Sequence, residues 1–383
     1  MIKRCCLITT LLLLAACSSN PNEHKPSPLP ILPAKVEQVS LNKLQSWTVG
    51  KGFNKPNEVV ARLARQNDTV YAASHDGTVL AIEGVAKVRW QQKTKLAITG
   101  GLSAAYGRVV TATANAEVLS LDAATGNVQW QKTLLAPVLA AVAQTDERVI
   151  VQSNDGKVYG LDAATGNTVW VYDTPAPVLS LRGYASPVVF EDLVVISTAT
   201  GKLVALAAQT GIPQWEVRVA NANGRSELER MIDIDGDMLL SADEVLYVAS
   251  YQGQVVAVDV AEAKPILQWQ QTLSSYRALS AGVEHVYAVD DSSHLVALDK
   301  TTGKVVWKQQ DFAWRGLSHS VTANNYLFVG DKDGYVHIMA QSDGKLLGRF
   351  KVKGAVVDLL VNNNQLWVYT QQGQLRAYAL PSN

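Results

Sequence analysis

The sequence predicts an all-β protein, an eight-bladed propeller of four-stranded antiparallel blades, and three observations lead to this prediction. One segment of about forty residues recurs along the chain and ends in tryptophan almost every time. Within each copy, apolar residues alternate with a period of two, and turns that contain glycine interrupt them. A lone β-forming run near the N-terminus matches the outer strand that the last copy lacks.

The repeat is clearest in two neighbouring copies, VTATANAEVLSLDAATGNVQW and VIVQSNDGKVYGLDAATGNTVW. Six copies end in tryptophan, at Trp90, Trp130, Trp170, Trp215, Trp269 and Trp307, and a seventh ends in Phe350, where tryptophan is expected. The spacings are 40, 40, 45, 54, 38 and 43 residues. Such spacings are too long for leucine-rich or ankyrin repeats and are typical of propeller blades.

Each copy predicts four strands. In the copy that ends at Trp170, residues 149–151 and 157–161 form two β-rich runs separated by an Asn-Asp-Gly hairpin turn. Residues 169–171 supply the outer strand, and residues 178–181 are expected to begin the next blade beside the channel. The pattern therefore repeats once per blade.

The ends of the chain are predicted to close the ring. Residues 366–380 hold two inner strands without an outer strand, whereas residues 41–49 form a single β-run around Trp47, 43 residues before Trp90. We expect this run to complete the last blade, which leaves no sheet edge unpaired. Each repeat tryptophan is expected to bury its ring against the next blade and to place its indole N–H on an acceptor there.

Composition excludes several classes of protein. The 383 residues include 34 Lys+Arg and 34 Asp+Glu, so charge gives no basis for nucleic-acid binding. The three cysteines stand at positions 5, 6 and 17, so the rest of the chain holds no disulfide framework or Cys-ligated metal. No metal-binding histidine spacing, P-loop, dinucleotide-binding or nucleophile-elbow motif is present. We predict a protein without enzymatic activity, cofactor or metal.

The N-terminus has the features of an export signal. Lys3 and Arg4 precede an apolar stretch too short to span a bilayer. Leu14-Ala15-Ala16-Cys17 resembles the bacterial lipobox, and the alternative is an ordinary secretory cleavage site after small residues. The resemblance implies removal of residues 1–16, acylation of Cys17, including palmitate, and an outer-membrane anchor facing the periplasm. Residues 17–35, rich in proline, then form a tether, and residues 36–383 form the propeller.

The repeat phrase Leu121-Asp122-Ala123-Ala124-Thr125-Gly126, followed by Trp130, resembles the tryptophan-docking motif of quinoprotein (PQQ) propellers. Together with the lipobox and the repeat number, the whole chain resembles the BamB family, the lipoprotein subunits of the bacterial outer-membrane β-barrel assembly machinery. The resemblance implies a non-enzymatic scaffold that docks on the POTRA domains of BamA. It also implies contact with other subunits of the complex and with unfolded outer-membrane proteins.

The same resemblance implies which residues meet the partner. The family segment Leu-Ser-Leu-Arg-Gly stands here at 179–183, and an acidic loop follows a Glu-x-x-Arg stretch in the longest inter-repeat spacing. The partner-binding residues implied are Leu179, Leu181, Arg182, Asp233 and Asp235. We expect them to form one surface on the loops of neighbouring blades.

Three other functions are compatible with parts of the sequence. A quinoprotein dehydrogenase with PQQ and Ca²⁺ would share the repeats, but such enzymes are longer. Asp233, Asp235, Asp237 and Glu244 imitate an EF-hand series, but Met238 stands where that loop requires glycine. A periplasmic propeller that binds other peptides or ligands outside the assembly complex remains the principal alternative, because one fold hosts many functions.

Overall fold

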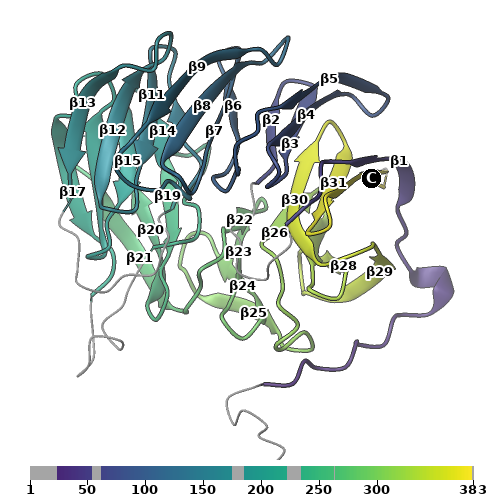
Figure 1. Cartoon of the computed structure of the whole chain (residues 1–383). Helices are drawn as coiled ribbons and strands as arrows, with labels where there is room; N and C mark the ends of the chain where they lie inside the picture. Colours follow the sequence, from purple (N-terminus) through teal and green to yellow (C-terminus); the bar gives the residue numbers. More distant parts are fainter. Residues whose placement is uncertain (1–23, 54–61, 175–184, 222–233, 263, 382–383) are drawn as a thin grey trace, which may run out of the picture.

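The computed structural model describes residues 24–53, 62–174, 185–221, 234–262 and 264–381. These residues form eight four-stranded antiparallel sheets arranged around a central axis (Figure 1). The predicted eight-bladed propeller is confirmed. Consecutive blades are numbered 1 to 8 below, and the first strand of each blade lies innermost, where it contacts the first strand of a neighbouring blade in several cases.

Blades 1 to 7 each consist of four consecutive strands. Blades 1 to 4 are β2 (Ala64–Gln66), β3 (Thr69–Ala73), β4 (Thr78–Glu83) and β5 (Lys87–Lys93); β6 (Ser103–Ala105), β7 (Arg108–Ala112), β8 (Glu117–Asp122) and β9 (Val128–Thr133); β10 (Ala143–Gln144), β11 (Arg148–Gln152), β12 (Lys157–Asp162) and β13 (Thr168–Asp173); and β14 (Val188–Phe190), β15 (Leu193–Ser197), β16 (Lys202–Ala207) and β17 (Pro213–Arg218). Blades 5 to 7 are β18 (Leu239–Leu240), β19 (Val245–Ala249), β20 (Gln254–Asp259) and β21 (Ile266–Thr272); β22 (Ser280–Ala281), β23 (His285–Val289), β24 (Leu295–Asp299) and β25 (Val305–Gln309); and β26 (Ser320–Ala323), β27 (Tyr326–Gly330), β28 (Tyr335–Ala340) and β29 (Leu346–Lys351).

Blade 8 is assembled from both ends of the chain. Its strands are β30 (Val356–Asn362), β31 (Gln365–Thr370), β32 (Gln374–Ala379) and β1 (Asn42–Thr48). β1 pairs antiparallel with β32, from Asn42 opposite Ala379 to Thr48 opposite Gln374. Trp47 stacks on the fully buried Trp367 with ring centroids 5.2 Å apart. The prediction that the N-terminal strand closes the last blade is confirmed.

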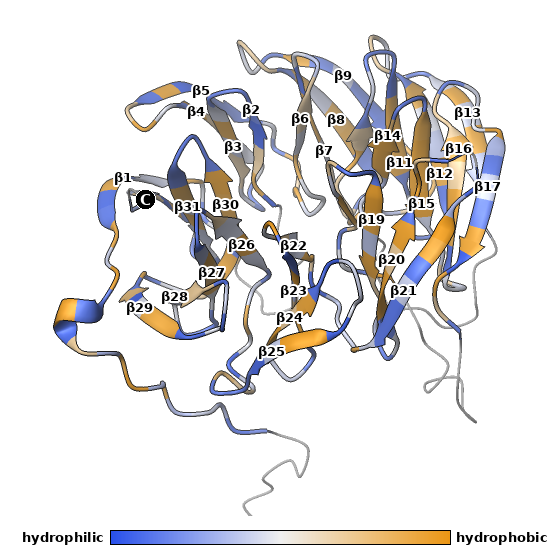
Figure 2. Cartoon of the chain, turned by 180° about the vertical axis from the view of Figure 1, so that it is seen from behind, coloured by the Kyte–Doolittle hydropathy of each residue, from blue (hydrophilic) through white to orange (hydrophobic). Residues whose placement is uncertain are grey.

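The core lies between the blades. The two middle strands of each blade are apolar and buried, whereas outer strands alternate exposed and buried positions, as in β13. Figure 2 shows hydrophobic residues running along the strands of neighbouring blades. One cluster joins Val110 and Val118 of blade 2 to Val149 and Leu161 of blade 3. β-Branched and leucine side chains thus hold each blade against the next.

Two sequence expectations are corrected by the strand register. In six blades the outer strand has a bulge, and the tryptophan directly after it pairs with a small residue: Ala81, Ser120, Gly160, Ala205, Ala257 or Ala297. In blade 7 this position is Gly348, not Phe350, and in blade 8 it is Gln45, not Trp47. Phe350 and Trp47 both lie two residues further along. The tryptophan repeat therefore covers six blades, not seven or eight.

A third expectation is also wrong. The innermost strand of blade 4 is β14, which comprises Val188–Phe190, so residues 178–181 do not form it. Those residues lie outside the part of the chain that the structure describes. They belong to the connection between β13 and β14, so the predicted Leu-Ser-Leu-Arg segment precedes the blade.

Residues 24–41 precede β1 and contain a single 3₁₀ turn, η1 (Lys35–Glu37). Among the described residues, no helix is long and apolar enough to cross a membrane.

Candidate docking site

The tryptophans of the repeat bind the following blade directly. Trp130 is buried, and its indole N–H donates to the carbonyl oxygen of Ala163 in blade 3 at 2.9 Å. Its ring packs on Gly166, where a Cβ atom would lie 2.6 Å from the ring. Gly166 has φ +72°, a left-handed conformation that glycine adopts without strain.

The same contact recurs around the ring. Four other tryptophans donate to a carbonyl of the next blade, in the pairs Trp90–Ala123, Trp170–Ala208, Trp269–Lys300 and Trp307–Gln341. Trp215 is half-buried and packs against the apolar cluster shared by blades 4 and 5. The Asp-x-x-Thr-Gly turn is held by its aspartate, since Asp162 accepts from both the amide and the hydroxyl of Thr165, which lowers the pKa of Asp162.

Most of the predicted functional residues lie outside the described residues. These are Cys17, Leu179, Leu181, Arg182 and Asp233. Asp235 is described: it is half-buried in the connection between β17 and β18. The two predicted docking segments thus belong to connections of one type, from the outer strand of one blade to the inner strand of the next. In an antiparallel propeller, such connections all lie on one face of the ring.

The described ends of these two segments bind each other. The amide of Ala185 donates to the carbonyl oxygen of Ile234 at 2.8 Å, and the amide of Ser186 donates to Oδ1 of Asp237 at 3.1 Å. The Ser186 hydroxyl accepts from the amide of Ala141 in blade 3 at 3.2 Å. We call Ala185, Ser186, Ile234 and Asp237 the loop junction. It fixes the point at which both predicted segments join the propeller.

A charged cluster in the channel extends this junction. Asp237 forms an ion pair with Arg62, which precedes β2. Arg62 leads into blade 1 and Asp237 into blade 5, on opposite sides of an eight-bladed ring, so their ion pair crosses the channel. Beside it, Nε2 of His319 lies 3.3 Å from Oδ1 of Asp358 and 3.1 Å from the carbonyl oxygen of Leu359. Arg62, Asp237, His319 and Asp358 are called the channel cluster below.

Burial sets the protonation of the channel cluster. Burial alone raises the pKa of Asp237, but the Arg62 guanidinium and the Ser186 amide outweigh it and hold this pKa below its usual value. Burial lowers the pKa of His319, although Asp358 opposes that effect, and burial raises the pKa of Asp358. At neutral pH the cluster therefore contains an Arg62–Asp237 ion pair and a neutral imidazole.

This arrangement bears on the calcium alternative. Asp237, one member of the EF-hand-like series, is engaged by Arg62 and Ser186. In the described part of the chain, no group of three or more His, Cys, Asp or Glu side chains is placed to hold a metal ion. The junction is suited to fixing loops in place.

The sequence comparisons agree with the fold. Residues 84–309 match a family model described as outer membrane protein assembly factor BamB. The outer membrane protein assembly factor BamB of Pseudomonas aeruginosa is 42% identical over 381 residues, covering 99% of each chain. The chain belongs to the BamB family. The crystal structure of BamB from Moraxella catarrhalis superposes with a TM-score of 0.81 at 32% identity, covering 89% of this chain and all of that one.

The propeller is also shared with enzymes. The quinohemoprotein alcohol dehydrogenase of Comamonas testosteroni has a TM-score of 0.69 at 13% identity, covering 91% of this chain and 78% of that one. At this identity the likeness shows the fold alone. The family of this chain is assigned from the sequence matches and not from the propeller, because one fold hosts many functions.

Sequence reasoning missed the channel cluster in this BamB-family chain. Arg62, His319 and Asp358 come from three blades, and no spacing in the sequence connects them. In the sequence, Asp237 stands out only as a member of the EF-hand-like series. The one available signal was that each polar residue lies just before or within an innermost strand, where a side chain faces the channel.

Proposed function

We propose that this chain is a non-enzymatic scaffold of the outer-membrane protein assembly complex, which docks on the POTRA domains of BamA and assists the folding and insertion of β-barrel proteins. The loop junction is the observation that carries the proposal. Because Ala185 and Ser186 bind Ile234 and Asp237, the segments that follow the family pattern, 179–183 and 233–235, begin from one anchored point. Two loops with a common base can present one continuous surface.

The chemistry of the segments suits a protein partner. Leu179 and Leu181 supply apolar anchors, and Arg182 supplies a planar fork with five donors. Asp233 and Asp235 supply acceptors for complementary charges on the partner. Interface energy concentrates in a few buried anchors, so loss of Leu181 or Arg182 should cost at least about 2 kcal/mol of binding free energy.

The rigid base matters for affinity. Loops that must be ordered on binding lose about 0.5–1.5 kcal/mol for each immobilised flexible side chain. The Arg62–Asp237 ion pair and the backbone bonds of the loop junction fix the ends of both segments before the partner arrives. We infer that this preorganisation favours docking.

Binding of single alanine variants to the isolated POTRA region of BamA tests the proposal. The positions are Leu179, Leu181, Arg182, Asp233 and Asp235. Val283→Ala is the matched control, because Val283 is 91% exposed and lies in the turn between β22 and β23, on the opposite face of blade 6. Weaker binding by the loop variants, with unchanged circular dichroism, supports the site. If all five variants bind as the parent does, the site is wrong.

We also propose that Cys17 is lipidated and holds the protein at the outer membrane, facing the periplasm. The lipobox-like sequence from Leu14 to Cys17 supports this. Mass spectrometry of the mature N-terminus is expected to find acylated Cys17 as the first residue. An unmodified Cys17 or a retained Met1 would contradict the anchor. A pull-down through the anchored protein that recovers other periplasmic peptides but no BamA would favour the alternative role outside the complex.

A further inference from the structure

The segment between the predicted anchor and the propeller is bound along its length. His24 stacks on Trp314 with ring centroids 3.8 Å apart, and the amide of Ser27 donates to the carbonyl oxygen of Ala313 at 2.9 Å. Leu32 packs on the apolar cluster shared by blades 6 and 7, and the amide of Val39 donates to the carbonyl oxygen of Leu347 at 2.9 Å. Residues 24–41 are called the strap below.

Two arginines of the propeller hold the strap. The guanidinium of Arg315 is almost completely buried, and it donates to Asp331 and Asp333 and, through Nη1, to the carbonyl oxygen of Ser27 at 3.0 Å. Arg349 of β29 donates to the carbonyl oxygen of Pro30 at 3.1 Å. Charge-assisted bonds from a buried arginine are among the stronger polar contacts. They indicate a built binding site for the strap.

Blade 7 makes room for the strap where other blades carry tryptophan. The tryptophan position of β29 is Gly348, and the carbonyl oxygen of Val39 lies where its Cβ would be, at 2.1 Å. Gly348 does not have a positive φ, so its backbone does not require glycine. Glycine is required here because any side chain would collide with Val39. A tryptophan here would also lack its usual partner, because β32 and β1 of blade 8 are not joined by a turn.

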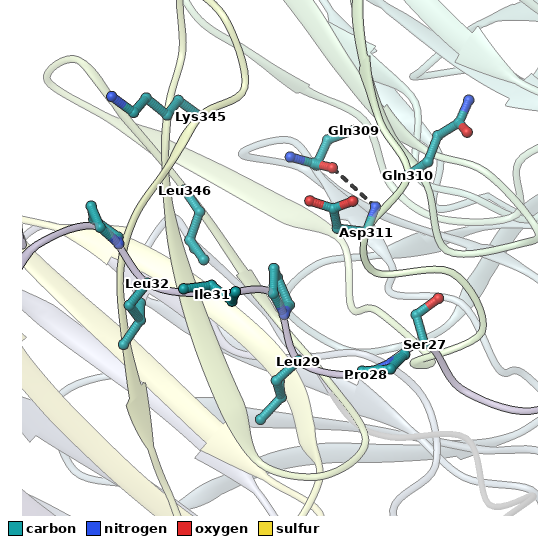
Figure 3. Close-up of a pocket in the computed structure, with 12 residues that line it drawn as sticks. Ser27, Pro28, Leu29, Ile31, Leu32, Gln309, Gln310, Asp311, Lys345 and Leu346 are labelled. Carbon is teal, nitrogen blue, oxygen red and sulfur yellow. Dashed lines mark hydrogen bonds between the residues drawn. The ribbon is translucent and has the colours of Figure 1, made fainter.

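Trp314 gives a further sign of a built site. Its φ is +62°, a conformation that costs a bulky residue about 1–3 kcal/mol. The conformation places its ring against His24. In Figure 3, Ser27 to Leu32 pass Gln309–Asp311 and Lys345–Leu346. These residues line a pocket of about 700 Å³.

The strap shortens the reach of the predicted anchor. Fully extended chain spans at most about 3.6 Å per residue, so Cys17 lies within about 25 Å of His24. If the chain were free as far as Leu41, the limit would be about 86 Å. His24 lies at the connection between β25 and β26, which is of the same type as the connections that hold the docking segments. The last described contact before the anchor, at His24, therefore lies at a connection on the docking face.

The strap and the outer strands beside it are basic. Residues 24–48 and 340–351, which include the strap, carry six basic and two acidic side chains, a net charge of +4. Without the strap, residues 340–351 and 42–48 carry four basic and one acidic side chain, a net charge of +3, whereas the matching residues 162–173 and 207–218 of blades 3 and 4 carry one basic and three acidic side chains, a net charge of −2. Ile31 and Val36 are also 96% and 95% exposed on the strap. Cationic and apolar side chains together favour an anionic lipid surface.

We propose that the strap fixes the orientation of the propeller at the membrane, with the edge of blades 7 and 8 against anionic phospholipid. The inference rests on the proposed lipid anchor at Cys17. It assigns a function to residues that otherwise only connect anchor and domain. It also places blades 3 and 4, which lie opposite, away from the bilayer.

Fluorescence quenching of the lipidated mature protein in phosphatidylethanolamine–phosphatidylglycerol vesicles tests the proposal. A fluorophore is placed on Thr48→Cys or on Arg218→Cys, which occupy equivalent exposed positions in blades 8 and 4, on opposite sides of the ring. Nitroxide lipids are expected to quench the probe at position 48 strongly and the probe at position 218 weakly. Equal quenching at both positions in the parent would overturn the proposal.

Gly348→Ala is the decisive variant, because its new Cβ meets Val39 without straining the backbone. It should remove the difference between the two probes while the circular dichroism spectrum stays that of the parent; a difference that persists would contradict the strap. Arg349→Gln should act in the same direction by releasing Pro30. Failure of the lipid anchor has its own two signs. The protein would not float with the vesicles, or the fluorophore would label Cys17 in the parent, which would show that this thiol is free.

Discussion

At the scale of single residues, the blade interface depends on a pair, tryptophan in one blade and glycine in the next. Trp130 combines a buried ring with a satisfied N–H, and Gly166 supplies both the turn and the space for the ring. Asp162 and Thr165 hold that turn in shape. The Thr-Gly and Trp of the repeat are thus two halves of one contact, separated by a blade.

The Gly166→Ala variant tests this pair. The new Cβ meets both a left-handed backbone and the Trp130 ring at 2.6 Å, whereas at Gly107, with φ +73°, a Cβ meets nothing within 4 Å. Gly107→Ala should therefore cost only the backbone strain, about 1–2 kcal/mol of unfolding free energy. Gly166→Ala should cost clearly more in urea denaturation. Equal losses for the two variants would show that the ring contact contributes little.

At the scale of strands and connections, sequence reasoning succeeded where the pattern is local. Period-two runs and Asn-Asp-Gly or Thr-Gly turns determine the strands of each blade, because their conformations depend on neighbouring residues. It failed where a position is defined by pairing across a sheet. Trp47 and Phe350 resemble the repeat tryptophans in sequence, but the bulges of β1 and β29 place them two residues away.

The channel cluster likewise cannot be found from a local sequence pattern, because its members come from blades 1, 5, 7 and 8.

The protonation of His319 in this cluster predicts how the stability of the fold depends on pH. Burial lowers the pKa of His319 in the folded protein, so the unfolded chain takes up a proton first as pH falls below about 6.5. Neutral His319 therefore makes its full contribution to the unfolding free energy above that pH, and this contribution is lost as the pH falls. Arg62, Asp237 and Asp358 are the charged groups that face it.

Urea unfolding at pH 7 and at pH 5.5 measures this contribution. We expect His319→Gln to reduce the difference in unfolding free energy between the two pH values relative to the parent. The absolute stability of the variant does not enter the comparison. An unchanged pH difference would show that folding does not lower the pKa of His319.

At the scale of the whole molecule, the ring is closed by strands from opposite ends of the chain. Deletion of residues 36–50 removes β1, leaves β32 as an open edge and uncovers Trp367. Loss of a buried aromatic contact alone costs about 3–5 kcal/mol, so the melting temperature should fall sharply in a calorimetric scan. Deletion of residues 18–23 is the control, because it spares both the strap and β1. If the 36–50 deletion melts like the parent, the closure contributes no stability.

The central proposal is that segments 179–183 and 233–235 extend from the loop junction and bind BamA. Site-specific photo-cross-linking in native membranes tests it most directly, with the cross-linking side chain placed at Leu181, at Asp235 and, on the opposite face, at Val283. The account predicts cross-links to BamA from positions 181 and 235 and none from position 283. Cross-links to BamA from 283 but not from 181 or 235 would contradict it.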